Sequence, residues 1–294
     1  MTNNKLNISA GRRLLLLLCL MAMALLFTSV IILVLPGGGS STSWQLASIC
    51  LQDILVFIMP ALAIAWLCYD CPWHFLCIDK APSWKFIAVA VVFFCVSLPM
   101  MNWMVETNKS IHLPQCMSGV EQWMLQTEEA AAKVTEQILN AKGNGYFIAT
   151  LIVVGLMAGL SEETLFRGIV MQTMRHSRWG DHAAVWMTAI VFSAFHMQFF
   201  GFVPRMLLGA WLGYLLVWSR SLWVPIIAHA LNNSMVVLAT HLENQGTLPE
   251  KYFDTIGLPA DGQYPWLALA STLACVALAV VLHRKYLSQV AQEK

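Results

Sequence analysis

Two adjacent carboxylates and an arginine stand at the end of an apolar run in the second half of the chain, where residues 161–167 read Ser-Glu-Glu-Thr-Leu-Phe-Arg. On a helix, Glu163 and Arg167 are four positions apart and can neutralise each other. Glu162 points about 100° away around the helix and has no local partner. Because ionisable groups inside a membrane are costly and mark functional sites by default, Glu162 is the first candidate for chemistry.

Two further polar groups interrupt apolar segments downstream. His196 ends the run Phe-Ser-Ala-Phe-His, and His229 and Asn233 are four apart in the run His-Ala-Leu-Asn-Asn, which puts them on one helix face. Each histidine alone is as readily explained by a structural hydrogen bond between helices. Together, these residues are the parts that activate water: a carboxylate as general base, imidazoles that orient the water or bind a metal, and an amide that stabilises an oxyanion.

The composition places these residues in a membrane protein. The chain has 294 residues, of which 58% are hydrophobic and 11% charged, against about 25% charged residues in soluble domains. A net charge of +1 excludes a protein built to bind nucleic acid or another polyanion. The eight cysteines lie mostly in apolar runs and indicate small buried hydrophobes rather than a disulfide framework.

The hydrophobic pattern predicts an all-α integral membrane protein with about eight transmembrane helices and no β-structure. The first run is too long for a signal-peptide core of roughly 7–15 residues and is followed by Pro-Gly-Gly-Gly at 36–39. Each run is near the ~20 residues that cross a bilayer. The predicted spans are 14–35, 46–68, 86–105, 146–170, 183–200, 203–218, 222–241 and 265–283.

The polar segment 106–144, between the third and fourth spans, carries apolar residues at helical spacing. This pattern predicts one or two amphipathic helices on the membrane surface, although a solvated hairpin fits it equally well. Most lysines and arginines fall on one side of the predicted topology, which predicts cytoplasmic N- and C-termini. We divide the chain into N-terminal helices with the amphipathic segment (1–145), a catalytic core (146–241), and an outer loop with the last helix (242–294).

The motifs Glu162-Glu163-xxx-Arg167, Phe192-xxx-His196 and His229-xxx-Asn233 resemble, in order, the three signatures of the CPBP family of CAAX proteases and bacteriocin-processing enzymes, also called the Abi family. The resemblance covers about 145–240. It implies an intramembrane endopeptidase of the cytoplasmic (inner) membrane of a bacterium, acting on a membrane-associated or lipidated peptide or protein.

The resemblance also implies roles for individual residues. Glu162 would be the general base and His196 its partner in holding the water, while His229 and Asn233 would complete the water site and stabilise the oxyanion. The Glu163–Arg167 pair would support the helix. Glu162, His196 and His229 form an adequate zinc set, and the family is often labelled metalloprotease. A metal-free mechanism uses the same residues, and the sequence leaves both open; the Asn233 amide, a poor zinc ligand, slightly favours the metal-free one.

Other functions fit the sequence less well. A proton-coupled transporter commonly shows internal repeats, and this sequence has none that we detect. A non-catalytic immunity or scaffold protein would not need intact motifs. A site-2-type protease needs HExxH, which is absent. The natural substrate, the cleavage site and the oligomeric state are not set by the sequence.

Three further expectations concern position. Counting ~1.5 Å per residue from the predicted helix ends places Glu162 near the cytoplasmic surface, His229 roughly 10 Å deep and His196 roughly 20 Å deep, which conflicts with a shared site. Asp53 is expected to be hydrated near a helix end, on the general behaviour of intramembrane charges. Arg205 is expected either to gate substrate or to anchor a helix start.

Overall fold

The computed structural model describes residues 5–34, 41–110, 113–177, 180–260 and 263–292. Within these ranges the chain is about 80% helical and contains no strand. Seven helices in the described ranges are long and apolar enough to cross a membrane. They are α1 (Ala10–Val34), the continuous α2–α3 helix (Thr42–Cys68), α5 (Trp84–Lys109), the continuous α7–α9 helix (Asn144–Arg175), α11 (Phe202–Ser219), α12 (Trp223–Asn244) and α13 (Trp266–Gln292).

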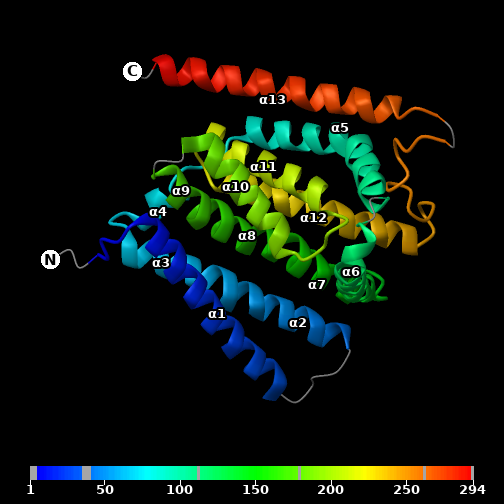
Figure 1. Cartoon of the computed structure of the whole chain (residues 1–294), viewed down its shortest axis with the longest axis horizontal. Coiled ribbons are helices and arrows are strands. Elements are labelled where there is room, and N and C mark those ends of the chain that lie inside the picture. Colours follow the sequence, from blue (N-terminus) through cyan, green and yellow to red (C-terminus); the bar gives the residue numbers. More distant parts are fainter. Residues whose placement is uncertain (1–4, 35–40, 111–112, 178–179, 261–262, 293–294) are drawn as a thin grey trace.

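The remaining predicted span, 183–200, corresponds to α10 (Gly180–Phe195), which has 16 residues and a length of ~24 Å. It packs along α11 in the middle of the bundle. Figure 1 shows that α1 begins and α13 ends at the same end of the bundle. α10 is not among the seven helices that are long and apolar enough to span, so an eighth span at 183–200 stays a prediction. The predicted all-α membrane fold is confirmed.

Two of the long helices are α-helices interrupted by π-helical segments. The first consists of α2 (Thr42–Gln52), a π segment (Asp53–Ile58) and α3 (Met59–Cys68). The second consists of α7 (Asn144–Thr150), a π segment (Leu151–Met157), α8 (Ala158–Glu163), a second π segment (Thr164–Met171) and α9 (Gln172–Arg175). Such π segments are frequent at functional sites, and here they border the residues that the sequence singled out.

The segment between the third and fourth spans forms a single helix, α6 (Ser118–Leu139), after a short 3₁₀ turn (Gln115–Met117). Figure 1 shows α6 lying across one end of the bundle. It is held there by contacts with the ends of other helices, including a hydrogen bond of 2.9 Å between the side chains of Gln45 and Gln137. The amphipathic-helix prediction holds, and the alternative hairpin is wrong.

Most predicted spans shift at their ends. The fourth continues past residue 170 to Arg175, the fifth ends at Phe195 instead of 200, and the last runs to Gln292. The predicted end of the first span at residue 35 and the 36–39 stretch lie outside the described residues. The fourth and last helices extend because their final turns are polar and lie beyond the apolar stretch that the sequence pattern marks.

Small residues let the central helices approach closely. A Cβ on Gly159 would lie 2.9 Å from the backbone nitrogen of Ala230, so α8 and α12 meet at this glycine. On α11, a Cβ on Gly209 would lie 3.2 Å from the Phe192 ring, and one on Gly213 would lie 3.1 Å from Val185. These contacts bring the three motif-bearing segments together.

Candidate active site

The three motif helices do not begin at a common level. A Cβ on Gly168 would lie 3.3 Å from the Leu222 side chain, so α12 begins beside a residue seven positions before the end of the α7–α9 helix at Arg175. This offset is about 10 Å. It brings His229, near the start of α12, level with Glu162. The depth estimate from the sequence is wrong because it assumed that every helix starts at the membrane surface.

Glu162 lies between the two histidines. Nε2 of His196 is 3.8 Å from its Oε1, and Nε2 of His229 is 3.9 Å from its Oε2. Both distances are longer than direct hydrogen bonds, and Oε2 is buried without a hydrogen-bond partner. The Glu162 side chain is 17% exposed. Its carboxylate therefore faces both imidazoles across a gap.

The other nitrogen of each histidine fixes its tautomer. Nδ1 of His196 lies 2.9 Å from the carbonyl oxygen of Phe192, and Nδ1 of His229 lies 2.8 Å from Oε1 of Glu163. Because both partners are acceptors, each Nδ1 carries the proton, and a neutral imidazole then has its lone pair on Nε2. The Glu162 carboxylate and the two Nε2 atoms are therefore three hydrogen-bond acceptors that lie close together. A donor such as water, or a cation, satisfies all three.

Glu163 belongs to a buried network of hydrogen bonds. Its Oε1 accepts a hydrogen bond of 2.7 Å from Nη1 of Arg167, and both side chains are 0% exposed. Nη2 of Arg167 donates to the Gly209 carbonyl at 2.9 Å, and its guanidinium lies 4.5 Å from the Phe192 ring centre. The ion pair expected from the i,i+4 spacing is thus present. It joins α8, α11 and α12 and holds the His229 ring.

The amide of Asn233 lies on the same side of α12 as His229. Its Nδ2 donates to the Val154 carbonyl at 3.2 Å, in the first π segment of the α7–α9 helix. The neighbouring Asn232 donates to Oδ1 of Asn233 at 3.4 Å. The sequence analysis did not name Asn232 as a site residue. Its position next to Asn233 was the signal that could have identified it. Each amide has two N–H groups, so donors remain for a substrate.

These residues share one cavity of about 370 Å³. Glu162, His196, His229, Asn232 and Asn233 supply its polar lining. The opposite wall comes from α5, which the sequence had not connected to the site because its apolar residues resemble any lipid-facing span. The α5 residues in the lining are Phe94, Ser97, Leu98, Met101 and Val105.

Arg205, at the start of α11, also lines this cavity. Its Nη1 donates to the Gln198 carbonyl at 3.4 Å, and Nη2 donates to the Gln198 side-chain oxygen. Of the two expectations for Arg205, the position in the cavity favours contact with substrate. It is the only arginine or lysine in the cavity lining.

The expectation for Asp53 is wrong. The residue is 6% exposed and accepts a hydrogen bond of 2.8 Å from the hydroxyl of Ser161, next to Glu162. Its Oδ2 is buried without a partner. Asp53 is not near a helix end because the α2–α3 helix runs from Thr42 to Cys68, and this places it mid-helix against α8.

The zinc set named from the sequence has suitable donors. Two imidazole Nε2 atoms and a carboxylate are ligands that zinc accepts. Within the described ranges, however, no three His, Cys, Asp or Glu side chains surround a common metal position. Whether the site holds a metal stays a prediction, and the reaction steps proposed below do not pass through one.

The fold and the cavity define a multi-pass membrane protein with a buried carboxylate–histidine site. Residues 144–235 match the family model Rce1-like, described as type II CAAX prenyl endopeptidase Rce1-like, and this match contains all three motifs. The match shows that this segment is similar to the CPBP/CAAX proteases, which are hydrolases. No curated protein and no solved structure matches the chain.

The family match confirms the resemblance that the motifs indicated. Bacterial origin, the inner membrane, the side on which the termini lie and the three-part division at residues 145 and 241 stay predictions.

Proposed function

We propose that the chain is an intramembrane endopeptidase that hydrolyses a peptide bond of a membrane-associated or lipidated peptide, with Glu162 as the general base. The observation that carries the proposal is the convergence of the Glu162 carboxylate and two Nε2 lone pairs on one point of the cavity. A water molecule is the nucleophile that such a set of acceptors binds and polarises.

The residues suggest a sequence of steps. Glu162 takes a proton from the water molecule while the water oxygen attacks the carbon of the scissile carbonyl. An N–H of Asn233 or Asn232 donates to the oxyanion that forms. Glu162 then gives the proton to the leaving amine. Glu163 keeps His229 in the tautomer that presents Nε2 to the water, so it acts as a positioning residue.

The cavity also suggests the substrate. The α5 wall is apolar apart from Ser97 and suits a lipid chain or large apolar side chains. Arg205 suits an anionic group, such as the free carboxylate at a peptide C-terminus. Together they favour a lipidated peptide that is cut near its C-terminus.

The test is cleavage of a fluorogenic lipidated peptide and a panel of unmodified peptides by purified protein in detergent. Glu162→Ala, His196→Ala and His229→Ala are each expected to abolish cleavage, whereas Glu129→Ala, at an exposed carboxylate on α6, is expected to cut at the wild-type rate. Cleavage that survives in Glu162→Ala would overturn the site assignment.

A zinc chelator added to each reaction tests the metal question separately. The proposal expects cleavage to continue after chelation. Loss of activity on chelation and recovery with zinc would assign the water to a metal and require the three side chains to close around it.

A further inference from the structure

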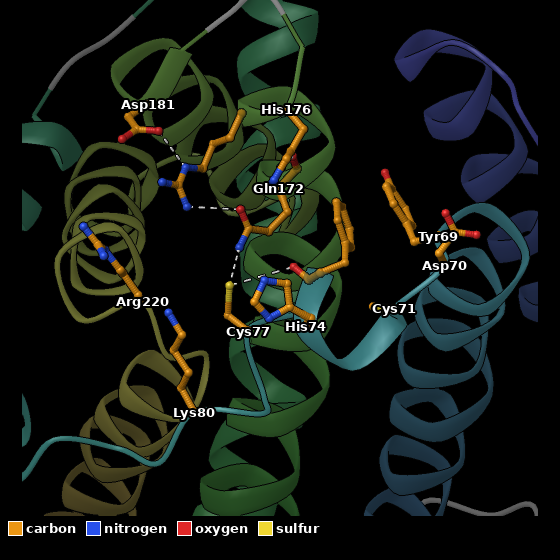
Figure 2. Close-up of a pocket in the computed structure, with 12 residues that line it drawn as sticks. Tyr69, Asp70, Cys71, His74, Cys77, Lys80, Gln172, His176, Asp181 and Arg220 are labelled. Atoms are coloured by element: carbon orange, nitrogen blue, oxygen red, sulfur yellow. Dashed lines mark hydrogen bonds and ion pairs between the residues drawn. The ribbon is translucent and has the colours of Figure 1, made fainter. Parts of the chain in front are cut away.

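A second cavity, of about 410 Å³, opens at the end of the bundle where α1 begins and α13 ends. Its wall comes from four parts of the chain: the loop after α3 that contains the short helix α4 (Pro72–Phe75), the region around α9, the first turn of α10, and the end of α11. Figure 2 shows this lining. The residues are Tyr69, Asp70, Cys71, His74, Phe75, Cys77, Lys80, Gln172, Arg175, His176, Asp181 and Arg220.

The lining is positively charged. Lys80, Arg175 and Arg220 supply three cations against the two carboxylates Asp70 and Asp181, before either histidine is counted. Figure 2 shows Lys80 and Arg220 on the same side of the cavity. The catalytic cavity, in contrast, has Glu162 and Arg205 as its only fully charged residues.

One of these cations is held in place by its surroundings, and the backbone of another is fixed. Arg175 donates to Asp181 at 2.7 Å and to the Gln172 side chain at 3.1 Å, and its side chain is 18% exposed. The backbone of Lys80 is fixed separately, because its carbonyl accepts a hydrogen bond of 2.7 Å from the Ser221 hydroxyl. The Lys80 ammonium can therefore be changed without removing that contact.

The cavity is not built for covalent chemistry. Burial raises the pKa of the Cys77 thiol above its ordinary value, and the Gln172 amide donates to its sulfur at 2.9 Å. A neutral thiol is a poor nucleophile. No group of metal-binding side chains occurs in the described part of the chain. A positively charged cavity suits an anion.

Tryptophans place this cavity at the membrane boundary. Trp73, in the loop that forms the wall, is 56% exposed, and Trp84, where α5 begins, is 73% exposed. The indole N–H of Trp223 donates to the Ile78 carbonyl of the same loop at 3.0 Å. Exposed tryptophans lie at the level of lipid headgroups, where phosphate is the abundant anion.

We propose that this cavity binds a phosphate group through Lys80, Arg175 and Arg220, and that an anionic phospholipid headgroup supplies it. Basic pockets of this kind between transmembrane helices bind anionic headgroups. The same chemistry would accept a soluble phosphate compound, so the experiment has to separate the two sources. The site lies outside the catalytic cavity and does not depend on the proposed function.

The experiment measures the thermal unfolding midpoint of the full chain in neutral detergent during titration with short-chain phosphatidylglycerol, phosphatidylcholine or inorganic phosphate. Wild type is compared with Lys80→Gln/Arg220→Gln. The matched control is Lys109→Gln/Lys251→Gln, which removes the same charge from a cavity lining that also contains Glu106 and Asp254. Lys80→Gln alone serves if the double variant does not fold.

Phosphatidylglycerol is expected to raise the midpoint of wild type and control, and to bind the Lys80→Gln/Arg220→Gln variant roughly 10- to 30-fold more weakly, as two lost cations near an anionic headgroup imply. Lys80→Gln alone is expected to weaken binding about fivefold. Equal protection by inorganic phosphate, lost in the same variant, would support phosphate binding and assign a soluble source. Equal protection of all variants by phosphatidylglycerol, or none of wild type, would overturn the proposal.

Discussion

Glu162 and Glu163 are neighbours in sequence, yet the structure gives them opposite surroundings. Glu163 is 0% exposed and bonded to Arg167 at 2.7 Å and to His229 at 2.8 Å. Glu162 is 17% exposed, lines the proposed catalytic cavity, and stands 3.8 and 3.9 Å from two histidine nitrogens that are themselves acceptors. Oε1 of Glu163 is bonded to a guanidinium and an imidazole N–H, although its Oε2 has no partner. The Glu162 carboxylate, in contrast, faces imidazole nitrogens that need a donor.

The difference suggests two roles: Glu163 keeps the structure of the site in place, and Glu162 takes part in the proposed reaction. A buried ion pair resists change, because removal of one partner leaves an uncompensated charge. A carboxylate without a bonded donor is free to bind and deprotonate water. The helix twist of about 100° per residue points two adjacent side chains into these two environments.

The largest expected effect is on catalysis at Glu162. Glu162→Gln keeps the shape of the side chain but removes the base, so cleavage is expected to fall by about 10³-fold or more. The free energy of unfolding is expected to change by less than about 1 kcal/mol. Peptide cleavage and chemical denaturation in detergent measure the two quantities. A large loss of stability would mean that Glu162 is structural.

The next largest effect is on stability at Glu163. Glu163→Gln leaves the buried Arg167 without its counter-charge and is expected to cost about 3–5 kcal/mol of unfolding free energy. The control is Glu129→Gln, which breaks an exposed pair with Lys133 on α6 and is expected to cost at most about 0.5 kcal/mol. Equal, small changes in both variants would remove the distinction drawn between the two carboxylates.

Asn233 tests whether the amide contributes to catalysis. Asn233→Ala removes a candidate oxyanion donor and is expected to lower the turnover rate about 10²-fold, with a smaller change in KM. The loss of its hydrogen bond to Val154 is expected to cost about 1 kcal/mol of stability. A variant with unchanged turnover would assign Asn233 to structure alone and leave Asn232 as the donor.

A smaller effect is expected at Asp53, which contacts the catalytic helix through Ser161. Asp53→Ala leaves the Ser161 hydroxyl without this acceptor and is expected to lower activity less than about tenfold, with about 1 kcal/mol of lost stability. Asp53→Asn keeps an acceptor oxygen and is expected to recover most of both. Failure of Asn to recover activity would show that the charge of Asp53 matters for Glu162.

The smallest effect concerns an exposed pair. The hydrogen bond from His74 lowers the pKa of Asp79 below its ordinary value of 3.8. A lowered pKa in the folded state adds stability above pH 3.8 that is lost as the pH falls through the lowered pKa. Unfolding midpoints of wild type and His74→Gln are therefore expected to differ slightly near neutral pH and to converge in acid. A difference that persists in acid would contradict this.

The sequence predicted the helices well, and it singled out polar residues that the fold brings together, because apolar length and polar interruptions are local signals. Glu162, His196, His229 and Asn233 all line one cavity. The sequence could not predict their depths, because the level of α12 depends on the contact between Gly168 and Leu222.

Other parts of the structure leave no local signal. The α5 wall of the catalytic cavity has the composition of any span that faces lipid. Asp53 meets Ser161 across 108 positions of sequence. Lys80, Arg175 and Arg220 line the second cavity but come from separate parts of the chain. No local sequence pattern marks any of the three, so only the fold brings them together.

The measurement that tests the central claim most directly is cleavage of a lipidated peptide in H₂¹⁸O by wild type and by Glu162→Gln, at equal folded fractions, with the products weighed by mass spectrometry. The account predicts one ¹⁸O atom in the new C-terminal carboxylate for wild type, and no product above background for the variant. Cleavage by Glu162→Gln at the wild-type rate would contradict it.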